Sequence, residues 1–196
     1  SNIWATNLQL FSTEHRYLSQ NNVIEVFPLS QSWDEGTQRY SATPPSVSSG
    51  SYQAADGATW VYRTESTSSK WITSSFGEGA TGSYTMQDGG GTWYTGSAFK
   101  GTEDFMASPD TLDIDVDVTN IITKYSASYY QDATYPDGII NNGFIIKKPQ
   151  QTEEDSNLGS GELKYFSTNT HTIYPPKLTF RWDDSSYSPS VGSTTL

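Results

Sequence analysis

Apolar and polar residues alternate in two stretches of the chain, 112–117 and 177–183. A period of two places successive side chains on opposite faces of a strand. We therefore expect both stretches to be strands whose apolar side chains share one dry interior between two sheets. Stretch 177–183 follows two prolines that lack a backbone donor, and we expect it to be the closing core strand. The apolar residues are Leu112, Ile114 and Val116 in the first stretch and Leu178, Phe180 and Trp182 in the second.

The period changes immediately after residue 117. Apolar residues then follow at i, i+3, i+4 and i+7, which predicts a short helix over about 118–125. Either Asp117 or Thr119 can cap the start of this helix. Further strands are predicted at 7–11, 23–29, 144–148 and 162–168, and apolar residues on both faces of 144–148 indicate a central position.

The composition favours β-structure joined by polar loops. Of 196 residues, 34% are hydrophobic and 14% are aromatic, and Gly, Ser and Thr are abundant. Such a chain forms few long helices, and its spaced aromatic residues argue against disorder. Residues 37–109 are weakly periodic and are predicted to be a long loop region. We expect one domain over 1–187 and a tail at 188–196.

The charge excludes some partners. The chain has 11 basic and 22 acidic residues, a formal net charge of -11, which should repel phosphate backbones, so no nucleic acid is expected. No run approaches about 18 apolar residues and no signal segment is seen, so no membrane is expected either. Cysteine is absent, which excludes disulfides and thiolate metal sites and fits synthesis in a reducing cytoplasm.

Five short segments, in order, resemble the DNRLRE-type β-sandwich, a jelly-roll module related to certain carbohydrate-binding modules. This resemblance implies an all-β, jelly-roll-like antiparallel β-sandwich with long loops and one short helix. The family's opening strands have no counterpart here, and the chain starts at Ser1 without Met. We therefore expect a processed product, part of a longer polypeptide, or strands supplied by another chain. The segments are Leu8-Gln9-Leu10-Phe11; 23–29 with Ser32-Trp33-Asp34-Glu35-Gly36; Gly57-Ala58-Thr59-Trp60 with Tyr62-Arg63-Thr64 and Lys70-Trp71; 112–120; and 143–147 with Tyr165-Phe166-Ser167 and Pro175-Pro176-Lys177-Leu178.

The end of the chain carries a second resemblance. Thr170-His171, the Pro-Pro-Lys-Leu run and Arg181-Trp182-Asp183-Asp184-Ser185 are similar to virion structural proteins of large contractile-tailed phages. This implies a non-enzymatic virion structural protein, assembled in the host cytoplasm, whose partners are other virion proteins or copies of itself in the capsid, neck, tail or fibre. The alternative is a carbohydrate-binding module that recognises a host surface or a polysaccharide. Neither role implies a cofactor.

Three tryptophans in polar loops are the candidate binding residues: Trp60, Trp71 and Trp93. Each can plug the core beneath its loop, contact a neighbouring subunit, or offer a flat ring to the face of a sugar. All three interpretations remain open from the sequence.

Three aspartates, Asp113, Asp115 and Asp117, are the candidate metal ligands, because Ca²⁺ prefers carboxylate and carbonyl oxygens. Residues i and i+2 of a strand lie about 7 Å apart. One ion would therefore need a further ligand from a facing loop, such as Asp110 or Asp137. We expect a solvated acidic face and no metal.

No catalytic constellation is visible. His15 and His171 are far apart in the sequence, and no Gly-x-Ser-x-Gly elbow occurs. Sequence spacing cannot show whether two carboxylates face each other as in a glycosidase. We expect that the protein is not an enzyme.

Overall fold

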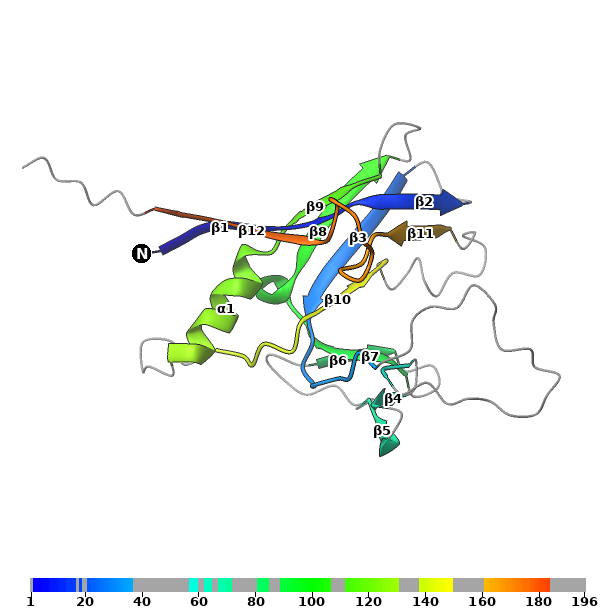
Figure 1. Cartoon of the computed structure of the whole chain (residues 1–196). Coiled ribbons are helices and arrows are strands. Elements are labelled where there is room, and N and C mark those ends of the chain that lie inside the picture. Colours follow the sequence, from blue (N-terminus) through cyan, green and yellow to red (C-terminus); the bar gives the residue numbers. More distant parts are fainter. Residues whose placement is uncertain are drawn as a thin grey trace, which may run out of the picture.

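The computed structural model describes residues 2–16, 18, 21–36, 57–59, 62–64, 67–71, 81–84, 89–106, 112–130, 138–149 and 161–183. In these ranges the chain forms antiparallel strands with one α-helix and one 3-10 turn (Figure 1). The expected fold class, all-β with one short helix, is confirmed; the jelly-roll strand order stays a prediction. None of the helices in the described ranges has the length and hydropathy to cross a membrane.

One three-stranded sheet has the order β12-β1-β9. Strand β1 (Asn2–Leu10) lies in the middle, with β9 (Ile114–Asp117) on one side and β12 (Lys177–Asp183) on the other. Both neighbours are antiparallel to β1, and residue 8 is opposite residue 116 in β9 and residue 178 in β12. Both alternating stretches were predicted to be strands. Strand β12 covers all of 177–183, and β9 covers residues 114–117 of the stretch 112–117.

The second three-stranded sheet has the order β10-β3-β8. Its strands are β3 (Asn21–Pro28) in the middle, β10 (Phe144–Lys147) and β8 (Gly101–Met106). Strand β10 thus lies at an edge of this sheet in the described structure, and its predicted central position is wrong. Apolar residues occur on both faces of β10 because Phe144 packs against the main core, whereas Ile145 on the opposite face packs against Phe27 and Trp93.

Short two-stranded pairs complete the described structure. Strands β2 (Ser12–Arg16) and β11 (Glu162–Tyr165) pair beyond the end of β1. The region 37–109, predicted as a long loop, contains β4 to β8 and the 3-10 turn η3 (Ser97–Phe99). Its strands are short and rich in glycine, so they leave no clear period in the sequence. The others are β4 (Tyr62–Thr64), β5 (Ser69–Lys70), β6 (Thr81–Tyr84) and β7 (Gly89–Tyr94).

Helix α1 (Thr119–Tyr130) begins where expected and is longer than expected. Oδ1 of Asp117 accepts hydrogen bonds from N–H and Oγ1 of Thr119, at 2.9 and 2.6 Å, and so caps the first turn. The helix continues past Tyr125, and Ala127, which is not part of the apolar stripe over 118–125, is also buried. The residues around Ala127 are small and polar, so the apolar pattern in the sequence stops before the helix ends.

The core lies between the two three-stranded sheets and α1 (Figure 1). It is closely packed where β8 meets β9: a Cβ at Gly101 would lie 2.7 Å from the carbonyl oxygen of Asp117, so only glycine fits there. The core side chains come from β1, β3, β9, α1 and the segment after it: Leu8, Leu10, Ile24, Val26, Ile114, Val116, Val118, Ile121, Ile122, Tyr125 and Ile139.

Only one of the two apolar stripes belongs to this core. Leu112, Ile114 and Val116 are buried, as expected. The apolar residues of β12 are exposed, so the expectation of one shared dry interior is wrong for the closing strand. The reason is cover, because β8 packs beside β9 and α1 packs on β1, whereas in the described part of the chain β12 packs mainly against β1.

Candidate functional site

Strand β12 carries three large apolar side chains that face water. Leu178, Phe180 and Trp182 are 37%, 42% and 62% exposed; we call these three residues the β12 strip. In the register of the sheet, Leu178 is opposite Leu8 and Phe180 is opposite Thr6, and both β1 residues are buried. Directly opposite residues share a face of the sheet. The strip therefore continues the core face of the sheet beyond its cover.

The outer edge of β12 is also unpaired in the described part of the chain. Thr6 N–H donates to Oγ1 of Thr119, and Thr6 C=O accepts from N–H of Val118, so the main chain of Thr6 points away from β12. Main-chain N–H and C=O groups point to alternate sides along a strand. Because Thr6 is opposite Phe180 and does not bond β12, the residues of β12 whose main chain faces β1 are the odd-numbered ones. The N–H and C=O groups of the strip residues consequently point outward from the sheet.

The opposite face of β12 is polar and basic. Lys177 and Arg181 lie on this face, and Nζ of Lys177 sits 5.0 Å from the centre of the Phe11 ring. The ring of Tyr174 packs on both Phe11 and Phe166, with centroids 5.5 and 6.1 Å away. These contacts hold the segment that enters β12 against the junction of β1 and β2. The strand is therefore fixed at its start while its edge stays open.

A pocket of about 350 Å³ lies at the other end of the molecule, beneath the end of β3. Trp33 stands 43% exposed in its wall, and Trp71 is buried. Both indole N–H groups already donate to backbone carbonyls, Trp33 to Asn142 at 2.9 Å and Trp71 to Thr59 at 3.0 Å. The pocket offers mainly apolar surface. Its lining is Leu29, Trp33, Ala58, Thr59, Trp71, Gly91, Phe144 and Ile145.

The three predicted tryptophans are not brought together as one platform. Trp93 is buried and packs on Phe27 with ring centroids 6.1 Å apart. Trp71 is buried against the pocket, and Trp60 lies outside the described residues. Sequence reasoning missed Trp33 as a site residue and read it only as part of the segment that follows the strand at 23–29.

A buried ion pair joins β3 and β10 next to Trp93. The side chain of Lys147 is 6% exposed, and its Nζ lies 3.8 Å from Oε2 of Glu25. Lys100 approaches the other carboxylate oxygen of Glu25 at 2.5 Å. Nζ of Lys147 also lies 6.0 and 5.7 Å from the ring centres of Phe27 and Trp93. Two cations thus flank one carboxylate, and the ammonium of Lys147 also lies over two aromatic rings.

The three aspartates around β9 bind other parts of the chain. Each carboxylate accepts at least one hydrogen bond, at distances of 2.6 to 3.0 Å. In the described ranges, no group of three or more His, Cys, Asp or Glu residues is placed to hold a metal ion. Asp110 and Asp137 lie outside those ranges. The donors are Ser12 N–H for Asp113, the side-chain amides of Asn7 and Gln9 for Asp115, and Thr119 for Asp117.

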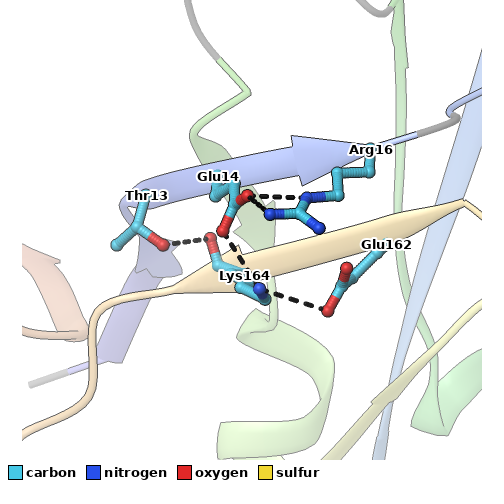
Figure 2. A network of polar contacts seen from close by, with 5 residues as sticks. All are labelled: Thr13, Glu14, Arg16, Glu162 and Lys164. Carbon is cyan, nitrogen blue, oxygen red and sulfur yellow. Dashed lines mark hydrogen bonds and ion pairs between the residues drawn. The ribbon is translucent and has the colours of Figure 1, made fainter. Parts of the chain in front are cut away.

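An exposed network of charges joins β2 and β11 (Figure 2). Glu14 bonds Nζ of Lys164 at 3.0 Å and also pairs with Arg16, and Lys164 reaches Glu162 at 3.3 Å. The hydrogen bond from Lys164 is the main cause that lowers the pKa of Glu14 below its ordinary value. The two histidines are exposed on separate segments, His15 in this pair of strands and His171 after a turn.

Comparison with family models, with curated proteins and with solved structures finds no match to this chain.

Proposed function

We propose that this chain is a non-enzymatic virion structural protein of a tailed bacteriophage, a β-sandwich module that contacts neighbouring subunits through the β12 strip. It is assembled in the host cytoplasm and resides in the virion, with other virion proteins or copies of itself as partners. One observation carries the proposal: three large apolar side chains stand exposed on an edge strand, on the face that forms the core elsewhere.

Physical chemistry favours a protein partner for this strip. Burial of apolar surface contributes about 25 cal/mol per Å², and contiguous exposed apolar surface commonly marks an interaction site. Phe and Trp are typical of the buried centre of interfaces. The open edge adds main-chain donors and acceptors that a partner strand can pair with. A net charge of -11 disfavours nucleic acid at this surface.

The proposal is tested in virus particles. Trp182→benzoylphenylalanine is introduced during infection, and purified particles are irradiated and analysed by mass spectrometry. We expect the chain in the particles, with a cross-link from position 182 to another virion subunit. Thr67, exposed and distant in sequence from the strip, provides the control position for the same photoreactive residue. Absence of the chain from particles would refute the proposal.

The second candidate, a carbohydrate-binding module, is favoured by the exposed ring of Trp33 at the pocket. A flat indole face suits a sugar ring, but the mainly apolar lining leaves few groups to orient sugar hydroxyls, so we rank this function second. A glycan array tests it. Specific, saturable binding that Trp33→Ala abolishes and Trp182→Ala preserves would support the carbohydrate-binding function. An array on which no glycan binds would refute it.

A further inference from the structure

We propose that β12 pairs with β12 of a second copy of this chain, antiparallel and across a two-fold axis at Phe180, to give a continuous six-stranded sheet. The inference rests on the proposed function in that it names the partner of the β12 strip. Its basis is the order of residues along the strand, Lys177-Leu178-Thr179-Phe180-Arg181-Trp182-Asp183.

The strand is self-complementary about its middle residue. With Phe180 on the axis, Lys177 of one copy is opposite Asp183 of the other, and Leu178 is opposite Trp182. Opposite residues share a face, so the two strips join into one apolar stripe while unlike charges meet on the other face. The even-numbered residues have outward main-chain groups, so each of their pairs can exchange two hydrogen bonds.

Other two-fold registers are worse. An axis at Thr179 sets Lys177 opposite Arg181, and an axis at Arg181 sets two arginines opposite each other, and like charges in direct opposition are destabilising. An axis at Trp182 leaves Leu178 beyond the paired segment. Only the axis at Phe180 uses all of β12, whose preceding residues, Pro175 and Pro176, cannot donate backbone hydrogen bonds.

The size of the contact sets the expected strength. A fully covered aromatic side chain buries about 150–250 Å², and the strip residues are already partly covered. Edge-to-edge pairing leaves the outer face of the strip in water, so it would bury well under the roughly 1,200 Å² of a standard interface. We therefore expect a weak dimer whose population depends on concentration.

Sedimentation equilibrium of the whole chain, over about 1–500 µM, tests the pairing. We expect the average mass to rise from monomer to dimer over this range. Phe180→Pro removes an N–H that makes no bond to β1, so the strand can keep its place while pairing is blocked. This variant should stay monomeric with an unchanged far-ultraviolet circular dichroism spectrum. A wild-type chain that stays monomeric throughout would overturn the inference.

A charge swap tests the register and keeps the test decisive if Phe180→Pro does not fold. Lys177→Asp places two carboxylates opposite each other at both ends of the paired strands, and Asp183→Lys places two cations there. Each single change should weaken dimerisation about tenfold or more. The double variant restores unlike pairs and should return the dissociation constant to within about threefold of wild type. Failure of this rescue would overturn the Phe180-centred register.

The results separate this inference from the proposed function. A monomer at every concentration, with position 182 cross-linked in particles to a different protein, would refute self-pairing and leave the virion role standing. A dimer with the rescue pattern, from a chain that is missing from particles, would refute the virion role and leave self-pairing standing.

Discussion

Strands β9 and β12 flank the same central strand and carry the same alternation of apolar and polar residues, yet only β9 is buried. Ile114 and Val116 of β9 are almost completely covered, whereas Phe180 and Trp182 of β12 face water. Both sets lie on the core face of the sheet, because Ile114, Val116 and Phe180 are in register with buried residues of β1 and Trp182 is two residues beyond Phe180 on the same strand. The period of two thus specifies the face of a side chain, and the elements packed over that face decide its burial.

The cover ends between β1 and β12. Helix α1 packs against β1, and β8 lies against β9, so both strands are enclosed. No comparable cover reaches the strip, whose three side chains remain exposed. A monomer gains little from three large apolar groups exposed in this position, whereas pairing with a second copy would bring two such strips side by side. The buried stripe of β9 therefore contributes to folding, and we propose that the exposed strip of β12 contributes to assembly.

The largest expected effect separates the two strands directly. Ile114→Ala removes buried side-chain atoms and leaves a cavity, so the free energy of unfolding should fall by about 2–5 kcal/mol. Leu178→Ala is the matched control on the same face, and its effect should be below about 1 kcal/mol. Urea unfolding at a protein concentration that keeps the chain monomeric measures both. Equal losses would show that the strip belongs to the monomer's core.

The same contrast between buried and exposed groups applies to ion pairs. Glu25→Gln leaves the buried ammonium of Lys147 without its carboxylate, which should lower the free energy of unfolding by about 2 kcal/mol. Glu14→Gln in the exposed network is the matched control and should cost less, because water screens its partners. Urea unfolding at pH 7 measures the loss of stability in both variants. A larger loss for Glu14→Gln would contradict the view that the buried ion pair of Glu25 contributes more than the exposed one.

The small contribution of Glu14 should depend on pH with a definite sign. Its pKa in the folded chain is below the ordinary 4.5, so its ion pairs stabilise the fold above that value. This stabilisation is lost as the pH falls through the folded-state pKa. The difference between wild type and Glu14→Gln should therefore vanish in acid, and a difference that grows there would contradict the pKa direction.

Much of the fold was predictable because local patterns define strands well. The alternation around Ile114 and the i, i+3, i+4 spacing before Tyr125 predicted β9 and the start of α1. The end of α1 was missed because Ala127 is too small to mark a buried position among polar residues. The strands within 37–109 were missed because strands of two to six residues with several glycines have no measurable period.

The candidate site was less predictable because it depends on what lies over a surface. The side chains of β12 were assigned to the right face, but edge position and lack of cover come from long-range topology. Trp71 and Trp93 were recognised as candidates, and the structure buries both. The exposed tryptophan at the pocket, Trp33, was read only as part of a motif, since nothing local distinguishes a ring in a pocket wall from one in the core.

The next smaller effect concerns the polar side of β9. Asp117 caps α1, so Asp117→Ala should lower the free energy of unfolding by about 1 kcal/mol. Asp113→Ala is the control, because Asp113 accepts a hydrogen bond from the exposed N–H of Ser12 and not from the start of a helix, and its loss should be smaller. Urea unfolding of both variants measures the difference. A larger loss for Asp113→Ala would contradict the capping role.

The smallest expected effect is none at all, and it tests whether the polar face of β9 holds a cation. Asp113, Asp115 and Asp117 each accept hydrogen bonds from different partners, so their carboxylates are held apart rather than converging on one point. An excess of EDTA should therefore leave the melting temperature within about 1 °C of the untreated protein, because a bound ion would add its binding free energy to stability. Added Ca²⁺ should likewise leave it unchanged. A drop of many degrees on chelation would mean that these carboxylates bind an ion together with ligands from outside the described residues. The polar side of β9, rather than the apolar side of β12, would then be the first surface to test for function.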